Sequence, residues 1–241
     1  MFQHTGYLED TGLVTAGYAC GIWKTEYEGA SLCYDALSQE LSIPVSHMIR
    51  SCSTHSSIVK AVGLKDGGYG VTEPFSEGDS FDGMITDEPG ILLCTTEADC
   101  TPVYLLDPAR HVIGMVHSGW KGTAGRISAK AVELMKEKYG CVPSDIMVFI
   151  GPCMCGRCYE VGGELIEHFK DFEVGRIFAP GRGDRFYLDM PEAVRMALSE
   201  EGVLLKNIKG PTECTFENQA LCSWRRTKDR TKHLLTCIML K

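Results

Sequence analysis

Short apolar segments recur along the whole chain and constrain its fold more than any other feature. Apolar segments of about 4–8 residues that are bounded by Gly, Pro or polar residues predict β-strands rather than helices. The predicted strands are Leu13–Cys20, Ile58–Val62, Gly83–Thr86, Ile91–Thr95, Val103–Leu106, Val112–Val116, Ile146–Ile150 and Leu234–Leu240.

Helical periodicity is clear in only two segments. In Ala124–Tyr139 the apolar residues recur at helical spacing, and Gly140 follows at the position where glycine commonly ends a helix. In Pro191–Glu201 the preceding Asp189 can cap the first turn. Weaker helical patterns cover Ala30–Leu41 and Gly163–Asp171.

The order of these elements favours an α+β fold. Strands and helices intermingle without regular β-α-β alternation, and no GxGxxG sequence follows a strand, so a doubly wound nucleotide-binding sheet is not expected. The Gly-rich stretch Lys65–Asp79 has apolar segments on both sides, which indicates a long loop inside a domain. With 44% hydrophobic residues and enough length for a sizeable core, residues 1–241 are expected to form one domain.

The net charge and the cysteine content of the chain restrict its binding partners and its cellular compartment. The net charge of −8, from 24 basic and 32 acidic residues, argues against non-specific binding to nucleic acid or to an anionic membrane. No apolar run approaches the roughly 18 residues of a membrane span, and Glu9 and Asp10 stand where a signal peptide would be apolar. We therefore expect a cytoplasmic protein whose 12 cysteines are reduced thiols.

Three residues of metal-ligating type stand at the ends of predicted strands. His55 lies between two apolar segments, Cys100 precedes one, and His117 ends another before a Gly-bounded turn. Imidazole and thiolate favour Zn²⁺, and three protein ligands leave a fourth position for water or substrate. From spacing alone, histidines with ordinary structural hydrogen bonds are the commoner case, so both interpretations stay open at this point.

A second concentration of cysteine is Cys153, Cys155 and Cys158, shortly after a predicted strand. Cys155 and Cys158 have CxxC spacing, which is half of a zinc site, and the sequence shows no second closely spaced cysteine pair. A redox thiolate is an alternative, because the neighbouring Gly156 and Arg157 would favour the ionised sulfur. We expect small residues packed in a tight loop, and changing all three cysteines to serine is expected to leave about one zinc ion per chain.

Anion-binding candidates are Lys121, in the turn after His117, and the adjacent Arg225 and Arg226. A single lysine in such a turn is usually solvated. Neighbouring residues of a strand point to opposite faces, so at most one of the two arginines is expected to line a pocket.

Several motifs, in this order, resemble those of the YfiH/YlmD laccase-domain family. They cover most of the chain from about residue 50 onward, and the ADC and HxGW elements are the most specific. The matching segments are Phe81–Thr86, Thr95–Val103, Asp107–Pro108, His117–Thr123, Ile150–Pro152, Cys158–Gly162 and Ser223–Arg226.

The resemblance implies a fold and a metal. It implies a single-domain αββα sandwich with a zinc site formed by His55, Cys100 and His117. It further implies a purine nucleoside phosphorylase that acts on adenosine, inosine, guanosine and S-methyl-5′-thioadenosine and that also deaminates adenosine. The expected partners are small purine nucleosides and phosphate, bound by a monomer.

The remaining candidate residues receive roles from this chemistry. Lys121 with Arg225 or Arg226 would balance the charge of phosphate, while Asp82 or Glu160 would move the proton in deamination. The sequence also departs from the family pattern. It lacks the usual segments before the first histidine, has Ser where Gln often precedes that histidine, and has Lys121 where Arg is commoner. These departures concern substrate contacts more than the metal site.

Three other functions are compatible with parts of the pattern. A laccase-type copper polyphenol oxidase needs on the order of ten histidines for its copper centres, whereas the chain has 7, so only a single copper at the three ligands is compatible. A Cys–His hydrolase that edits peptidoglycan precursors would use Cys100 as nucleophile and His117 as base, and chelators would leave it active. A non-catalytic binding module would turn over no nucleoside.

Overall fold

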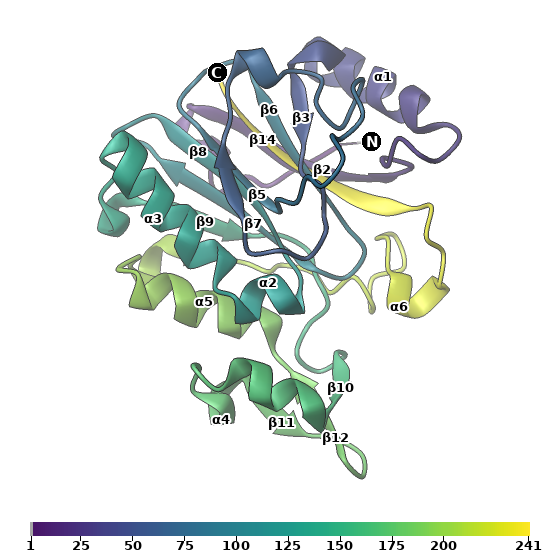
Figure 1. The fold of residues 1–241 in the computed structure, drawn as a ribbon, viewed down its shortest axis with the longest axis vertical. Coiled ribbons are helices and arrows are strands. Elements are labelled where there is room, and N and C mark those ends of the chain that lie inside the picture. Colours follow the sequence, from purple (N-terminus) through teal and green to yellow (C-terminus); the bar gives the residue numbers. More distant parts are fainter. Residues whose placement is uncertain (1) are drawn as a thin grey trace.

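A five-stranded sheet is built from both ends of the sequence (Figure 1). The computed structural model describes residues 2–241. The strand order is β1-β2-β14-β6-β3, with β14 antiparallel to both β2 and β6 and with β3 parallel to β6. The strands are β1 (Gln3–His4), β2 (Val14–Gly21), β3 (Met48–Arg50), β6 (Leu92–Glu97) and β14 (His233–Leu240).

A six-stranded sheet packs face to face against the first. Its order is β13-β9-β7-β8-β5-β4, and β7 pairs antiparallel with both β8 and β9. Leu93 and Ile238 of the first sheet share one buried cluster with Tyr104 and Met115 of the second, so the main core lies between the sheets. The strands are β4 (Val59–Ala61), β5 (Gly83–Thr86), β7 (Thr101–Asp107), β8 (Val112–Ser118), β9 (Met147–Ile150) and β13 (Ile208–Lys209).

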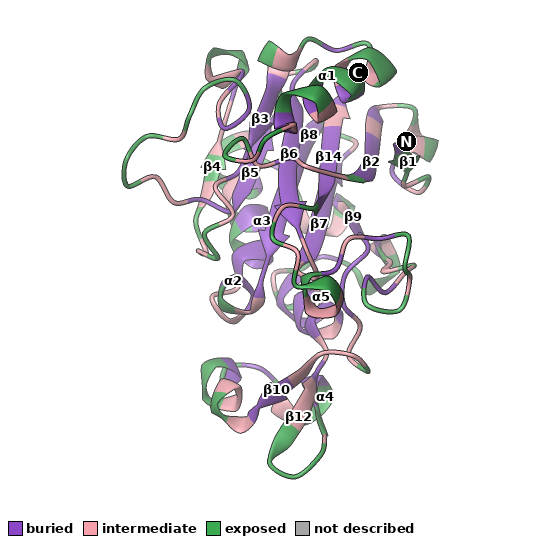
Figure 2. Ribbon diagram, turned by 90° about the vertical axis from the view of Figure 1, so that its right-hand side faces the viewer, coloured by how far each residue is buried: buried purple, intermediate pink, exposed green. Residues whose placement is uncertain are grey.

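Helices cover the outer faces of both sheets. Helix α1 (Ala30–Leu41) packs on the first sheet through Tyr34 and Leu37, while α3 (Ile127–Tyr139) and α5 (Met190–Glu200) pack on the second. Figure 2 shows buried strands between helices whose outer faces are exposed. The predicted αββα sandwich is therefore confirmed. Within residues 2–241, every helix is too short or too polar to span a bilayer.

Most predicted elements are present. All the apolar segments listed above form strands, and the helix Ala30–Leu41 has the predicted bounds. Asp189 caps α5, since its Oδ1 accepts a hydrogen bond from Glu192 N at 3.0 Å. The helix predicted over Ala124–Tyr139 is wrong at its start. The chain forms α2 (Trp120–Ala124) and then α3, because Arg126 has φ of 58°, outside the helical region.

A small third sheet, in the order β10-β12-β11, extends beyond the sandwich next to α5 (Figure 1). Phe169 and Phe178 pack there with Ile177 of α4 (Val174–Ile177). The helix predicted over Gly163–Asp171 is a 3-10 segment, Gly163–Phe169. The sequence predicted none of these strands, because each is short and lacks a continuous apolar run. The strands are β10 (Glu160–Gly162), β11 (Phe178–Pro180) and β12 (Arg185–Leu188).

Candidate active site

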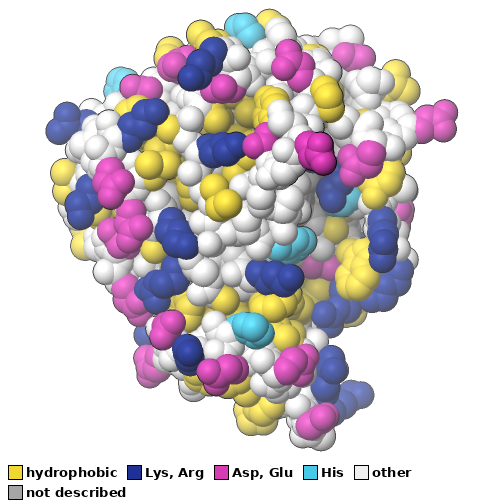
Figure 3. All heavy atoms as spheres, viewed as in Figure 1, with side chains coloured by type: hydrophobic (Ala, Val, Ile, Leu, Met, Phe, Trp, Pro, Cys, Tyr) yellow, Lys and Arg dark blue, Asp and Glu magenta, His cyan; other side chains and the backbone are white. Residues whose placement is uncertain are grey.

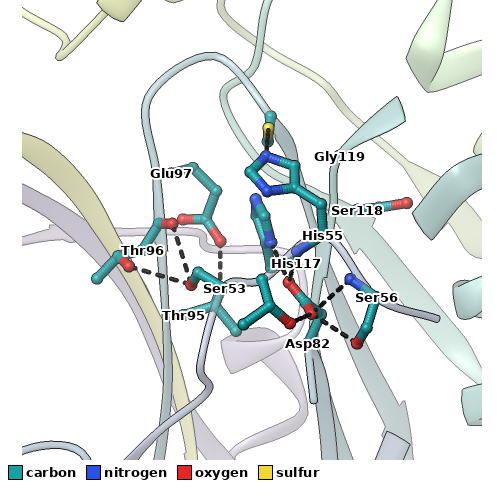
Figure 4. A network of polar contacts seen from close by, with 12 residues as sticks. Ser53, His55, Ser56, Asp82, Thr95, Thr96, Glu97, His117, Ser118 and Gly119 are labelled. Carbon is teal, nitrogen blue, oxygen red and sulfur yellow. Dashed lines mark hydrogen bonds and ion pairs between the residues drawn. The ribbon is translucent and has the colours of Figure 1, made fainter. Parts of the chain in front are cut away.

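His55, Cys100 and His117, here called the trio site, converge where β6 passes into β7. Figure 4 shows the two histidines close together. His55 comes from the loop between β3 and β4, Cys100 from the turn between β6 and β7, and His117 from the end of β8. One ligand atom of each lies within 4.8 Å of the other two, and Cys100 Sγ is 3.7 Å from His55 Nε2. Three segments distant in sequence thus supply two imidazoles and one thiol to one point.

The backbone around the trio site is under conformational constraint. A Cβ on Gly119 would lie 2.5 Å from His55 Cδ2 and 3.3 Å from Cys100 Sγ, so a larger residue there would displace the ligands. His55 and Asp99 adopt φ of 63° and 94°, in the left-handed region that costs free energy for residues other than glycine. The surrounding structure therefore holds these side chains in place against local strain.

Asp82 fixes the orientation of His117 and of the backbone at His55. Its fully buried carboxylate accepts hydrogen bonds from His117 Nδ1 at 2.7 Å, from His55 N at 2.9 Å and from Ser56 N at 2.8 Å (Figure 4). The proton on His117 Nδ1 leaves Nε2 free to act as a ligand. Although burial works the other way, the hydrogen bonds from His117 and Ser56 hold the pKa of Asp82 well below its usual range. The expected proton-transfer role of Asp82 therefore does not fit its surroundings, which make it a positioning residue.

Cys100 and His117 influence each other's ionisation. Burial opposes the thiolate form of Cys100, yet the neighbouring imidazoles outweigh it and lower the pKa of the thiol. Burial likewise opposes protonation of His117, but Cys100 and the hydrogen bond to Asp82 raise its pKa. Even without a metal, the protein thus favours the ionised sulfur that metal coordination requires.

A cavity of about 570 Å³ opens beside the trio site, a volume typical of small-molecule pockets. It is lined by elements from both sheets and from the loop that follows α6 (Trp224–Thr227). Basic side chains gather over α6 on the face shown in Figure 3. The lining includes four tyrosine or tryptophan side chains and three lysine or arginine side chains, namely Tyr27, Trp120, Tyr159, Trp224, Lys24, Arg225 and Arg230.

The structure separates the predicted anion-binding residues. Arg225 lines the pocket, and its Nη1 also donates to Glu160 O at 3.0 Å. Arg226 instead donates to backbone carbonyls, including Phe216 O at 3.0 Å, and so holds a loop. The expectation that at most one arginine faces a pocket is met, although the pair lies on a short helix rather than on a strand.

Lys121 and Glu160 lie outside the pocket lining. Lys121 is an exposed residue of α2 whose Nζ lies 5.6 Å from the centre of the Trp120 ring. The turn after His117 is helical, and Trp120 rather than Lys121 lines the pocket, so the phosphate-binding role of Lys121 stays a prediction. Glu160 is absent from the lining and begins β10.

Several residues near the site received no role from the sequence. Lys24, Trp224 and Arg230 reach the pocket from loops and from a short helix, where periodicity gives no signal. Glu97 ends β6 fully buried, accepts a hydrogen bond from Thr236 Oγ1 at 3.0 Å, and has its pKa raised by burial to about 8. The one available signal for Glu97 was an acidic residue at the end of an apolar strand.

The described residues contain no further histidine cluster. In residues 2–241, only two groups of three or more His, Cys, Asp or Glu side chains bring their ligand atoms within 4.8 Å, and one of them is the trio site. The other contains no histidine. A trinuclear copper cluster, which needs about eight histidines, therefore has no counterpart in this part of the chain.

Comparison with known proteins identifies relatives along most of the chain. Residues 30–241 match the profile of the family described as multi-copper polyphenol oxidoreductase laccase. Purine nucleoside phosphorylase YlmD of Bacillus subtilis is 31% identical over 191 residues, which are 78% of this chain and 69% of the relative. Its namesake in Geobacillus stearothermophilus is 32% identical over 206 residues, covering 84% and 75%. Adenosine deaminase RL5, from an unknown prokaryotic organism, is 29% identical over 221 residues, covering 84% of each chain.

Solved structures show the same fold. The crystal structure of the Bacillus licheniformis hypothetical protein YfiH superposes with a TM-score of 0.90 at 25% identity, covering 100% of this chain and 96% of the other. The crystal structure of YlmD from Geobacillus stearothermophilus gives the same TM-score, identity and coverage.

Proposed function

The chain belongs to the family described as multi-copper polyphenol oxidoreductase laccase, as its motifs predicted, and from that premise we propose that it is a zinc-dependent purine nucleoside phosphorylase. The observation that carries the proposal is the trio site at the wall of a 570 Å³ cavity with aromatic and basic lining. The proposed substrates are adenosine, inosine, guanosine and S-methyl-5′-thioadenosine, together with phosphate.

The donor set of the trio site fits a catalytic zinc ion. His55, Cys100 and His117 would hold the metal, and the hydrogen bond from His117 Nδ1 to Asp82 is the outer contact that metal-binding histidines usually make. When bound, zinc supplies Lewis-acid polarisation at an open coordination position. A single copper ion suits the same donors, and metal analysis of the purified protein distinguishes the two.

The pocket residues would bind the two substrates and hold them in reacting geometry. Phosphorolysis forms a bond between a phosphate oxygen and C1′ of the ribose and breaks the glycosidic bond to the base. Arg225, Arg230 and Lys24 would bind the phosphate, because the net charge of −8 makes local cations necessary. Trp224 and Tyr159 offer aromatic faces for stacking with the purine base. Orientation of both reactants supplies the entropic part of catalysis.

Adenosine deamination is the second proposed activity. Its support is the 29% identity to the relative named adenosine deaminase RL5, together with an arrangement of three ligands that leaves a position open. In this reaction water replaces the amino group of the base, so inosine and ammonia form without phosphate.

The proposal extends to the form of the protein. We propose that residues 1–241 act as one catalytic domain and as a monomer, because the trio site and the pocket lining can be built from one chain. We also propose a cytoplasmic location, because the cysteines are all free thiols. Light scattering on the purified protein tests the monomer.

The decisive experiment measures base release from inosine by zinc-loaded protein with and without phosphate. We expect hypoxanthine and ribose 1-phosphate only when phosphate is present. Ammonia release from adenosine is expected in both conditions. Base release that is equal without phosphate would mean a nucleosidase and not a phosphorylase. Activity that survives removal of the metal by a chelator would favour the Cys–His hydrolase.

A further inference from the structure

Two turns that are distant in the sequence lie side by side. The first, Cys155–Cys158, is closed by a hydrogen bond from its last backbone N to its first carbonyl at 2.9 Å. The second, Cys214–Glu217, is closed by Asn218 N, which donates to Cys214 O at 2.9 Å. A β-bridge between Cys153 and Cys214 joins the two segments, so the fold fixes their relative position.

The two turns bring four metal-ligating side chains together. One ligand atom from each of Cys155, Cys158, Cys214 and Glu217 lies within 4.8 Å of the other three. Cys158 Sγ is 3.5 Å from Glu217 Oε1, and Cys155 N donates to Cys214 Sγ at 3.4 Å. Zinc at about 2.3 Å from each sulfur needs sulfur atoms about 3.8 Å apart, so shifts of up to about 1 Å would complete a tetrahedron.

We propose that these four side chains, here called the turn site, bind a structural Zn²⁺ ion. Four protein donors fill a tetrahedron and leave no position for substrate, as in structural zinc sites. Three thiolates select zinc over hard cations such as Mg²⁺ and Ca²⁺. Both turns also have the two-residue spacing that is usual between paired zinc ligands. This proposal replaces the expectation from the sequence that these cysteines are small residues packed in a tight loop. The sequence showed one CxxC pair without a second, because the second turn pairs Cys214 with a glutamate and not with another cysteine.

A metal accounts for this cluster better than a redox disulfide. A bond between Cys155 and Cys158 would use two of the four donors and leave the other two without a function. Cys155 and Cys158 are half-buried and Glu217 is exposed, so an ion can enter from solvent. Arg157 Nη2 lies 3.3 Å from Glu217 Oε2 and can orient this carboxylate, as outer contacts of metal ligands do.

The turn site is tied to the wall of the pocket. Met154 and Tyr159, which flank the first turn, both line the cavity. Thr215 of the second turn donates through Oγ1 to Asp99 Oδ1 at 2.7 Å, and Asp99 directly precedes the ligand Cys100. A zinc ion at the turn site would therefore hold both segments that support this side of the pocket.

Metal analysis of the full chain, purified with zinc supplied and then desalted, tests the proposal. We expect about two zinc ions per chain in the wild type and about one in both Cys155→Ser/Cys158→Ser and His55→Ala. The matched control is Cys20→Ser/Cys222→Ser. These two cysteines are also neighbours, with Cys222 N donating to Cys20 Sγ at 3.0 Å, but they belong to neither site. The control should keep about two zinc ions.

A second measurement does not depend on variants that alter the cysteines. In the His55→Ala background, Co²⁺ should give thiolate-to-metal charge-transfer absorption from the turn site alone. Glu217→Cys should strengthen that absorption, and Glu217→Gln should weaken zinc binding about 10-fold or more in competition with a chelator. About one zinc ion in the wild type with none in His55→Ala would overturn the proposal. So would a Cys155–Cys158 disulfide in freshly purified protein.

Discussion

The trio site and the turn site both contain cysteine thiols, but they differ in the number of their metal-ligating side chains and in the segments that supply them. The trio site takes one residue from each of three distant segments, a loop, a turn and a strand end, and two of its candidate ligands are oriented by the buried Asp82. The turn site takes two residues from each of two hydrogen-bonded turns, and one of its ligands is exposed. Three donors leave room for a substrate, whereas four do not, so the number of ligands separates a catalytic role from a structural one.

The difference also shows where rigidity comes from. At the trio site the sheets and a buried carboxylate hold the ligands before any metal binds, which suits a site that must stay open. At the turn site a bridge and a few hydrogen bonds and ion pairs join the two turns, so a metal would add to their mutual attachment. Each of the following experiments asks whether the two sites differ as this comparison requires.

The same Cys-to-Ser change in the two sites should have the largest and most distinct effects. Cys100→Ser should lower phosphorolysis more than about 100-fold, beyond what loss of an outer contact costs. Cys158→Ser should lower it by at most about 10-fold, while the melting temperature falls by about 4–8 °C, as for a loss of ~2 kcal/mol. Activity assays and calorimetry measure both effects. Cys33→Ser on α1 is the control. Equal losses of activity in Cys100→Ser and Cys158→Ser would contradict a catalytic role for one site and a structural role for the other.

Loss of the hydrogen bond between Asp82 and His117 should have the next largest effect. Asp82→Asn removes the negative charge that holds His117, so zinc affinity at this site should fall about 10–100-fold. Chelator competition in the Cys155→Ser/Cys158→Ser background measures it without the second metal. Asp79→Asn is the control, since Asp79 forms a pair with Lys60 at 3.0 Å away from both sites. An unchanged affinity in Asp82→Asn would show that the sheets alone orient the ligands.

Changing a basic residue of the pocket should have a smaller effect, and this effect should appear in the binding of phosphate. Arg225→Met should raise the KM for phosphate about 10-fold, as expected for the loss of one charge-assisted hydrogen bond, and should change the KM for inosine less. Lys121→Met, which removes an exposed lysine outside the pocket, should change neither by more than about twofold. Steady-state kinetics in both substrates decide the question. If Lys121→Met raised the KM for phosphate more than Arg225→Met did, Lys121 and not Arg225 would be the phosphate-binding residue.

The pH dependence of stability should show the smallest effect, at a pocket residue outside both metal sites. Burial, assisted by Lys24, lowers the pKa of His233 from 6.5 to about 4. The unfolded chain then binds more protons between these values, so stability is lost as the pH falls below about 6.5. We expect a loss of about 1 kcal/mol by about pH 5.7.

His233→Asn tests this effect, because asparagine can keep the hydrogen bond that His233 Nδ1 donates to Thr231 O at 3.2 Å. Urea unfolding at several pH values should show a flatter profile in this variant than in the wild type. Parallel profiles would mean that His233 does not titrate in this range.

Much of the sandwich could be predicted because its strands are continuous apolar runs. The layers follow from strands of that length and from amphipathic helices such as Ala30–Leu41. The break at Arg126 was not predictable, since a left-handed residue inside an apolar period leaves no compositional signal. The third sheet was missed because its strands are too short to show alternation.

The residues of the candidate site also fall into those that the sequence could predict and those that it could not. The trio site was predicted because its ligands follow strands and match specific motifs. The phosphate-binding role of Lys121 stays a prediction, because helix α2 starts at Trp120 and only Trp120 of this pair lines the pocket. Lys24 and Arg230 could not be found, since loops bring them to the pocket from opposite ends of the chain. The turn site needed the fold, because its two halves lie about 60 residues apart.

The position of β14 has a consequence for synthesis on the ribosome. This strand is made after nearly all the others, yet it lies between β2 and β6 and pairs along its whole length with β2. Until it emerges, the nascent chain carries two unpaired strand edges that can associate with other chains. Arg230 and His233 of the pocket arrive with it. The five-stranded sheet and the pocket lining are therefore completed together and late, and a chain that stops before residue 233 would lack the strand that joins β2 to β6 and would lack His233 of the pocket.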